Sequence, residues 1–451
     1  MVATTVRAPM PGPARTATLS LLRKLIWDRL GLMTTAATYG DAVRVAIGPK
    51  TMYFFNHPEH AKHVLADNAA NYRKGLGQSQ ARRALGDGLL TSDGELWRKQ
   101  RRLIQPVFQS KRIADQAGVV VEEAAGLVDR LRRREGRGPV NVVTELTALT
   151  LGVLGHALLA ADLDRFASIG HSFEAVQDQA MFEVVSLGVV PMWIPLPKQR
   201  RFRAARTDLQ RVVNELVAER LAAGGRLDGD DVLSRLIAAT RQETGTEAEQ
   251  RMHDELVTLL LAGHETTAST LGWVFHLLSR NPGARARVHE EAVTVLGDRL
   301  PVVEDLHRLT FTTMVVEEAM RLYPPVWILP RQALADDVVG GHRVPAGADV
   351  LVSPYALHRH PRFWTDPERF RPHRFDRSAA QDRARYAYIP FGAGPRFCVG
   401  NQLGMMEAVL VTAMVNRELE LTTMPGYRVV PEPMLSLRLR GGLPMTVRRA
   451  G

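Results

Sequence analysis

The stretch from about residue 248 to residue 280 limits the fold most, because it predicts one long helix that is too apolar for a surface. Apolar and small side chains recur every three or four positions, and the sequence Asn-Pro-Gly at 281–283 ends the pattern. The remaining segments of this 451-residue chain must therefore pack around that helix. The length and the 45% hydrophobic content are ample for one large core or two modest ones, and a sizeable ligand could be enclosed.

The centre of this predicted helix, Ala262 to Thr267, is unfavourable both for a helix and for a core. Gly263 costs about 0.8–1.0 kcal/mol relative to alanine, threonine hydroxyls can bend a helix, and a core acid is costly unless paired. One interpretation is a close helix crossing at Gly263 with a capped polar pocket. The functional interpretation is that Ala262 and Gly263 leave room for a flat ligand, while Thr266 and Glu265 deliver protons to it. His264 points elsewhere on the helix, and we expect it to be structural.

The rest of the chain predicts a mainly α fold with small β-sheets. Residues 40–55 read as two short strands around a Gly48-Pro49 turn, and strand patterns return at 338–354. Residues 110 to 295 are mostly helical in pattern, and no linker divides the chain. We therefore expect an N-terminal extension over 1–30 and a single domain over 31–451.

Composition excludes several classes of protein. A single cysteine cannot form an intrachain disulfide, a structural zinc site or an iron–sulfur cluster, which favours a reducing, cytoplasmic location. The N-terminus lacks an apolar signal region, and no run of about 18 apolar residues occurs, so we expect a soluble protein without stable membrane insertion. The net charge of +10 comes mainly from scattered arginines, which argues against nucleic-acid binding and favours an acidic protein partner.

Two pairs of residues outside the long helix have spacings that suggest a role. Glu318 and Arg321 share one face of a helix that Pro324-Pro325 must end, and a buried Glu318 would need partners from the arginine-rich segment 366–375. Trp97 and Arg101 lie one helical turn apart, so an indole N–H and a guanidinium could both reach an anion. Taken alone, this second pair fits a solvated basic helix with a half-buried tryptophan equally well.

The single cysteine stands in the sequence FGAGPRFCVG, residues 391 to 400, directly before a predicted helix. Glycines permit turns that other residues resist, and a helix N-terminus should lower the pKa of the Cys398 thiol. A catalytic thiolate would need a histidine base, and the sequence has no recognised cysteine-protease neighbourhood. An inert buried thiol would not need the glycines or Arg396. An axial haem ligand fits, because the iron requires only one thiolate from that side.

These motifs resemble those of the cytochromes P-450, soluble bacterial type. Phe391, Gly392, Gly394, Arg396, Cys398 and Gly400 match the haem-binding signature Phe-Gly-x-Gly-x-Arg-x-Cys-x-Gly at six positions in ten. In the expected order along the chain, residues 97–101 resemble the Trp-x-x-x-Arg motif, 262–267 the oxygen-activation motif, 318–321 the Glu-x-x-Arg motif and 367–370 the Pro-Glu-Arg-Phe motif. The resemblance covers roughly residues 30 to 450 and implies a haem b cofactor between the long central helix and the cysteine loop.

The resemblance also implies residue roles. Cys398 would ligate the iron, Thr266 and Glu265 would relay protons, and Glu318, Arg321 and Arg369 would form an internal structural triad. Basic residues near the cysteine side, Arg98, Lys99 and Arg102, would bind an acidic ferredoxin. The residues expected to contact haem are Trp97, Arg101, Ala262, Arg331, Phe391, Arg396, Cys398 and Gly400.

The activity implied is that of a monomeric monooxygenase, which inserts one atom of O2 into an apolar small molecule by hydroxylation or epoxidation. Electrons would come from NAD(P)H through a separate ferredoxin and reductase, because the chain ends about 50 residues after Cys398. The alternatives are a peroxide-driven oxygenase or isomerase on the same fold, which would need no Glu265-Thr266 relay, and a haem sensor without turnover.

Substrate is predicted less closely. The pocket would draw on residues 76–90, 181–196 and 326–329, together with Leu259 and Ala262, and Trp327 would add bulk. These stretches are mostly apolar, and the overall sequence is loosely similar to bacterial sesquiterpene oxygenases of the pentalenene type. A terpenoid in secondary metabolism is therefore expected, with fatty acids and polyketides left open.

Overall fold

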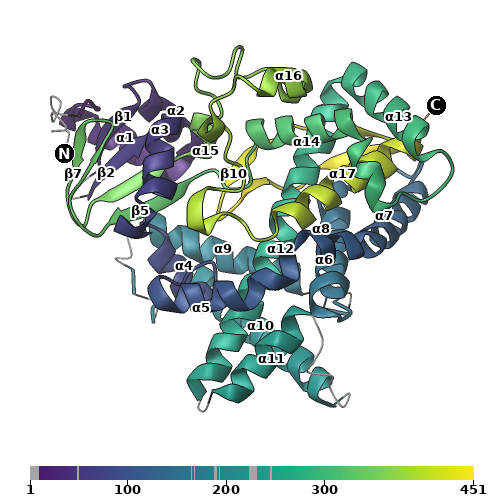
Figure 1. The fold of residues 1–451 in the computed structure, drawn as a ribbon, viewed down its shortest axis with the longest axis horizontal. Coiled ribbons are helices and arrows are strands. Elements are labelled where there is room, and N and C mark those ends of the chain that lie inside the picture. The colour runs from purple at the N-terminus through teal and green to yellow at the C-terminus, as the bar shows by residue number, and fades with distance from the viewer. Residues whose placement is uncertain are drawn as a thin grey trace.

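The computed structural model describes residues 10–450 except 48–49, 164, 167, 187–189, 192, 223–230 and 244–245. Helices form most of the molecule and the strands form small sheets, which confirms the predicted fold class (Figure 1). The longer helices are α5 (Gly94–Ile104), α7 (Ala117–Arg132), α8 (Val142–Leu154), α9 (Ile169–Val185), α10 (Pro197–Ala222), α11 (Val232–Gln242), α12 (Thr246–Arg280), α13 (Pro282–Leu296), α14 (Thr310–Leu322) and α17 (Asn401–Glu418). The shorter ones are α1 (Thr18–Trp27), α2 (Arg29–Ala37), α3 (Pro58–Lys62), α4 (Gln78–Leu85), α6 (Ser110–Asp115), α15 (Pro354–Leu357) and α16 (Arg377–Ala380).

Helix α12 is the predicted central helix, and it runs through the interior as expected. Leu256, Leu260, Leu271 and Val274 are fully buried on it at helical spacing. It packs against α8, α14 and α17 within one large core. The helix ends at Arg280, and Pro282 starts α13, so the Asn-Pro-Gly stop signal is confirmed.

A five-stranded sheet has the strand order β1-β2-β8-β5-β3. Its strands are β1 (Ala42–Ile47), β2 (Lys50–Phe55), β8 (Asp349–Val352), β5 (Leu329–Ala333) and β3 (Tyr72–Lys74). The two predicted N-terminal strands are therefore confirmed, whereas the predicted turn at 48–49 lies outside the described residues. Strands β3 and β5 pair antiparallel, and this register sets Lys74 opposite Arg331.

Smaller strands complete the fold. β4 (Val140–Asn141), β12 (Pro444–Arg449) and β9 (Leu419–Thr423) form a three-stranded sheet, whereas β6 (Asp337–Val339) with β7 (His342–Val344) and β10 (Pro431–Pro433) with β11 (Leu437–Leu439) form two hairpins. By length and composition alone, the stretch Val142–Leu159 could cross a membrane. This stretch is α8 with the turn after it, and 67% of it is buried inside the protein, where α8 packs against α12.

The pair Glu318 and Arg321 is completely buried on α14, as the sequence predicted for an internal ion pair. The predicted third member, Arg369, is wrong. Its side chain is exposed, and Arg369 contributes only its carbonyl oxygen to Arg321, at 3.2 Å. The second guanidinium that faces Glu318 belongs to Arg374, at 3.3 Å, and the N–H of Arg371 donates to the same carboxylate. The segment 366–375 is irregular, so residue spacing could not identify the arginine that turns inward.

Candidate active site

The loop from Phe391 to Gly400 folds back on itself in front of α17. The N–H of Cys398 donates to the carbonyl oxygen of Phe391 at 3.0 Å and closes the loop. Gly394 has a φ of +67°, and a Cβ there would lie 1.9 Å from the carbonyl oxygen of Leu65, so no other residue fits. Gly400 is the N-cap of α17, which confirms that Cys398 lies just before a helix N-terminus.

Cys398 lies deep in the protein, yet its side chain is exposed to an internal cavity. Burial raises the pKa of its thiol, and this effect outweighs the opposing influence of the Gly400 N–H and the Arg101 guanidinium. The lowered pKa predicted from the helix N-terminus is therefore wrong for the free thiol, because desolvation is the larger effect. A thiolate at this position needs a cation inside the cavity itself, and a bound metal ion deprotonates a coordinating thiol.

The cavity separates the cysteine loop from the middle of α12 and is predominantly apolar. Ala262 and Thr266 face it from α12, and Phe391 and Val399 face it from the loop. Leu259 also lines it from α12, and the residues that complete its lining from other elements include Phe108, Val153, Leu154, Leu158, Met320, Pro325, Val326, Leu403 and Glu407. This arrangement forms a slot between a helix wall and a thiol.

Gly263 lies both at a close helix crossing and on the cavity wall, which were the two interpretations drawn from the sequence. It lines the cavity, but a Cβ at this position would lie 2.6 Å from Cδ1 of Leu154 on α8. The close helix crossing is therefore real, and it alone requires a glycine. Ala262 is the small residue whose side chain is exposed to the cavity.

Positive charges gather at one edge of the site. Arg331 is almost fully buried, and Arg396 donates to the carbonyl oxygen of Ser92 at 3.0 Å and pairs with Asp93. Burial is the main cause that lowers the pKa of Arg331, to about 10, and the neighbouring Arg396 adds to it. Burial also lowers the pKa of Arg396, against the opposing effect of Asp93. One carboxylate thus lies near two guanidinium groups, of which one is buried and the other partly buried.

Helix α5 brings the other predicted pair to the same loop. The guanidinium of Arg396 lies over the Trp97 ring, 4.5 Å from its centre, and Nη1 of Arg101 donates to the carbonyl oxygen of Phe397 at 2.8 Å. Trp97 and Arg101 therefore share one helix face, as predicted, and both contact the cysteine loop rather than solvent alone.

Lys74 is a member of this group that sequence reasoning missed. It lies opposite Arg331 across the β3–β5 pairing, and its pKa is lowered well below its usual value, first by burial and then by Arg331 and Arg396. The available signal was its rarity, since lysine occurs at only seven positions among 58 basic residues. Lysine is chosen over arginine where a compact charge is needed.

These features fit a flat, dianionic metal cofactor such as haem. Arg331 is buried and Lys74 and Arg396 are partly buried, so three basic groups lie around the Asp93 carboxylate, and two further carboxylates would favour their charged forms. Among the residues that the structure describes, no group of three side chains could hold a metal ion. Cys398 could therefore bind a metal only if another molecule supplied the remaining ligands, as a porphyrin does.

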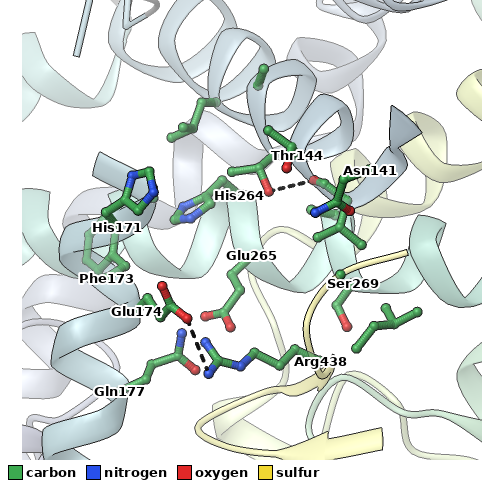
Figure 2. Close-up of a pocket in the computed structure, with 18 of the residues that line it drawn as sticks. Asn141, Thr144, His171, Phe173, Glu174, Gln177, His264, Glu265, Ser269 and Arg438 are labelled. Carbon is green, nitrogen blue, oxygen red and sulfur yellow. Dashed lines mark hydrogen bonds and ion pairs between the residues drawn. The ribbon is translucent and has the colours of Figure 1, made fainter. Parts of the chain in front are cut away.

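The two predicted relay residues face different cavities. Thr266 faces the Cys398 cavity, and its hydroxyl donates to the carbonyl oxygen of Ala262 at 3.0 Å. Glu265 instead points into a second cavity of about 660 Å³ behind α12, where it accepts a hydrogen bond from the Ser436 hydroxyl at 2.7 Å (Figure 2). Burial raises the pKa of this carboxyl, although Ser436, Gln177 and Arg438 oppose that rise.

Other side chains predicted near the site lie elsewhere. His264 is buried and bonds to the carbonyl oxygen of Leu260, consistent with a structural residue. Trp327 does not add bulk to the pocket, because it is buried in another cluster and its Nε1 donates to the Met434 carbonyl oxygen at 2.9 Å. Leu259, Ala262 and Val326 do line the cavity, whereas no described residue of 76–90 or 181–196 does so.

Comparisons with known proteins identify the family. Residues 11–444 match the family described as cytochrome P450. The chain is 38% identical to cyclooctatin synthase of Streptomyces melanosporofaciens over 90% of its own length and 89% of that protein. It is 36% identical to cyclooctat-9-en-7-ol 5-monooxygenase of the same species, over 94% and 91% of the two chains. It is 32% identical to pentalenene oxygenase of Streptomyces avermitilis, over 94% of each chain. The chain belongs to the cytochrome P450 family.

Proposed function

We propose that this enzyme inserts one atom of O2 into an apolar terpenoid, by hydroxylation or epoxidation, with Cys398 as the axial ligand of its haem b. Membership of the family makes the chain a haem b monooxygenase. The observation that carries the residue assignment is the Cys398 thiol, which faces an apolar slot whose opposite wall holds Thr266. We further propose a cytoplasmic monomer in which residues 31–451 form one haem-binding domain after an extension over 1–30.

Different residues of the chain would bind the iron of haem and its two propionate groups. When bound, haem supplies the iron centre at which O2 is activated. Phe391, Gly400 and Ala262 would form the walls of the slot, and the cations at its edge would bind the propionates. Those cations are Arg101, Arg331, Arg396 and Lys74. The neutral indole N–H of Trp97 would donate a further hydrogen bond.

Proton supply would come from the pair on α12. Because its pKa is raised, Glu265 holds a proton at a higher pH than an exposed glutamate does. A rotation of its side chain out of the second cavity would carry that proton toward the Thr266 hydroxyl, which already faces the Cys398 cavity. Thr266 would then pass the proton on into the Cys398 cavity, which its side chain lines.

The apolar lining and the names of the relatives support the substrate class. Relatives act on cyclooctat-9-en-7-ol, pentalenene and carotene by name, and all three are terpenoids. The cavity wall offers mainly hydrocarbon surface, from Leu154, Leu158, Leu259 and Val326. Such a lining favours a hydrocarbon skeleton that is oriented by shape.

An acidic ferredoxin would deliver electrons at the face that carries Arg98, Lys99 and Arg102 on α5. The three side chains are exposed, and α5 contacts the cysteine loop through Trp97 and Arg101. Glu95 pairs with Arg98 and Arg102, and Glu243 pairs with Lys99, so the face is partly neutralised before docking. A separate reductase would supply the ferredoxin with electrons from NAD(P)H.

The test begins with the absorption spectrum of the purified protein, reduced with dithionite under carbon monoxide. A strongly red-shifted Soret band that Cys398→Ser abolishes supports the thiolate assignment, and an unchanged band in the variant contradicts it. Turnover with ferredoxin, reductase and labelled O2 then tests the substrate class with cyclic terpenes against fatty acids. Activity with peroxide alone would favour the peroxide-driven alternative, and substrate binding without any product would favour the sensor.

A further inference from the structure

The second cavity, behind α12, is separate from the Cys398 cavity. Within the described part of the chain, the two cavities share no lining residue. Helix α8 divides them, since its Ala148 lines the second cavity and its Leu154 lines the first. On α12 the neighbours Glu265 and Thr266 are divided in the same way. A volume of about 660 Å³ lies within the usual range for a small-molecule site.

The second cavity can be reached from solvent between α8 and α9. Four of the residues that line it are exposed: Asn141 in front of α8, Thr144 and Ala148 on α8, and His171 on α9 (Figure 2). A ligand could therefore enter this cavity without passing through the Cys398 cavity. Occupancy of the two cavities can then be independent.

The inner walls of the second cavity are mainly apolar. Leu151 lines it from α8, Phe173 lines it from α9, and Leu163 and Phe166 line it from the connection between these helices. All four side chains are buried in the main core cluster, so their positions are set by packing. Such walls fit a hydrocarbon skeleton rather than an extended polar molecule.

Gln177 determines which polar group the cavity can bind. Its side chain is 2% exposed and forms a hydrogen bond with the Glu265 carboxyl group. The side-chain carbonyl oxygen of Gln177, however, is buried and has no hydrogen-bond partner among the residues that the structure describes. A buried acceptor without a partner costs free energy, so a ligand that donates a hydrogen bond would be favoured here.

The charged groups of the cavity are already paired with one another. Nε of Arg438 donates to Glu432 at 2.7 Å, and a second nitrogen of Arg438 lies 3.8 Å from Glu174 (Figure 2). Arg440 also pairs with Glu432, at 3.4 Å. A carboxylate ligand would compete with these acids for the arginines, and it could not donate to Gln177. A neutral donor such as a hydroxyl group disturbs none of these pairs.

We propose that the second cavity binds a neutral alcohol with a cyclic hydrocarbon skeleton, whose hydroxyl group donates to the side-chain oxygen of Gln177. Because Gln177 is hydrogen-bonded to Glu265, a ligand that fixes Gln177 also retains Glu265 in this cavity, away from Thr266. A hydroxylated terpenoid belongs to this class of alcohols. That identification, and the effect on proton supply, rest on the proposed function, whereas the binding site itself does not.

Binding is tested by isothermal titration calorimetry of the haem-loaded protein. A phenylimidazole bound to the iron keeps the Cys398 cavity filled. The probes are decahydro-2-naphthol and its methyl ether, which has the same skeleton but cannot donate a hydrogen bond. We expect the alcohol to bind about tenfold more tightly than the ether. Gln177→Met should weaken binding of the alcohol by about the same factor and leave binding of the ether unchanged.

A substitution that fills the cavity provides the second variant. Ala148→Trp should abolish binding of both probes, because the indole ring would occupy the space that Ala148 leaves open. Ala148→Ser is the matched control, since it keeps that space, and it should bind as the unchanged protein does. No binding of the alcohol, or equal binding by these two variants, would overturn the proposal. Equal affinity of the unchanged protein for alcohol and ether would overturn the role of Gln177.

The effect on Glu265 is tested during turnover of a terpene substrate, without the phenylimidazole. Decahydro-2-naphthol should increase the hydrogen peroxide released per NAD(P)H in the unchanged protein and not in Ala148→Trp. An equal increase in both proteins would assign the effect to the Cys398 cavity and overturn the link to Glu265. If Thr266→Ala also leaves peroxide release unchanged, the proton relay of the proposed function fails, and the calorimetric result still decides whether the site exists.

Discussion

Lys74, Arg331 and Arg396 repel one another in the protein alone, because Asp93 is the one acid, among the residues that the structure describes, that acts on all three. Lys74→Met should therefore raise the melting temperature of the haem-free protein, while it weakens haem retention by about 5- to 30-fold. Differential scanning fluorimetry and haem transfer to an acceptor protein measure the two effects. Arg73→Met is the matched control, since Arg73 is exposed on the same strand and contacts Gln332. A loss of both stability and haem would instead assign Lys74 a purely structural role.

The corrected ion-pair group predicts a contrast between two neighbouring arginines. Arg374→Met should destabilise the protein by about 3–5 kcal/mol, because it removes a partner of the buried Glu318 carboxylate. Arg369→Met should cost less than about 0.5 kcal/mol, since only the backbone of Arg369 reaches Arg321. Urea unfolding followed by circular dichroism distinguishes the two variants. Equal destabilisation by the two variants would indicate that the Arg369 side chain also belongs to the ion-pair group of Glu318 and Arg321.

Between α4 and α5, the connection is held onto α12 by two neighbouring acids. Asp254 accepts the Asp87 N–H at 2.7 Å, and Glu255 accepts the Leu89 N–H at 3.0 Å and 3.2 Å. The far end of the same connection gives the Ser92 carbonyl oxygen to Arg396. The backbone of this connection therefore links the N-terminal half of α12 to Arg396, one of the basic residues expected to bind the haem propionates.

The crossing of α8 and α12 gives a prediction about Gly263. Gly263→Ala should destabilise the protein by about 1–3 kcal/mol, because the new methyl group overlaps Leu154. This cost should vanish when Leu154→Ala is also present, which a double-mutant cycle in urea measures. Gly126→Ala on α7 is the control, since only the tip of Arg130 lies within 4 Å, and it should stabilise by about 0.5–1 kcal/mol. A Gly263→Ala variant as stable as the parent would exclude the crossing as the reason for this glycine.

At the scale of the whole molecule, buried titratable groups predict how stability depends on pH. Burial raises the pKa of Glu255 to about 8 from an ordinary value of 4.5, so between these values the folded state holds one more proton than the unfolded state. Stability then falls as pH rises. His264 has a pKa lowered to about 4 by burial and acts in the opposite sense, but only up to its ordinary value of 6.5.

The contribution of Glu255 to the free energy of unfolding should therefore decrease by about 2 kcal/mol between pH 6.5 and pH 8.5, whereas Lys74, whose pKa burial lowers well below its usual value, acts in the opposite sense. Glu317, with a pKa raised to about 7 by burial, adds to the same trend. Glu255→Gln should flatten much of this slope, because glutamine can still accept the Leu89 N–H but does not titrate. Urea unfolding at the two pH values provides the measurement, and an unchanged slope in the variant would show that Glu255 does not titrate in this range.

Local patterns predicted much of this molecule, and long-range contacts account for what they missed. The central helix and the cysteine loop follow from periodicity and from glycines, which act within a few residues. Lys74 joins the site only through pairing with a strand about 260 residues away, and no local pattern records that. Glu265 and Thr266 are adjacent on a helix, where successive side chains point about 100° apart. The prediction that both side chains act on the same bound ligand was therefore the least supported by the sequence.

The pairing of β3 with β5 limits when the site can assemble during protein synthesis. The site draws on Lys74 near one end of the chain and on Cys398 near the other, and 324 residues separate them. At a synthesis rate of about 5–20 residues per second, Lys74 leaves the ribosome roughly 16–65 s before Cys398 does. A growing chain therefore cannot bring Lys74 and the Cys398 thiol together until most of the chain has been made. Cofactor capture is confined to the last stage of synthesis or to the period after release.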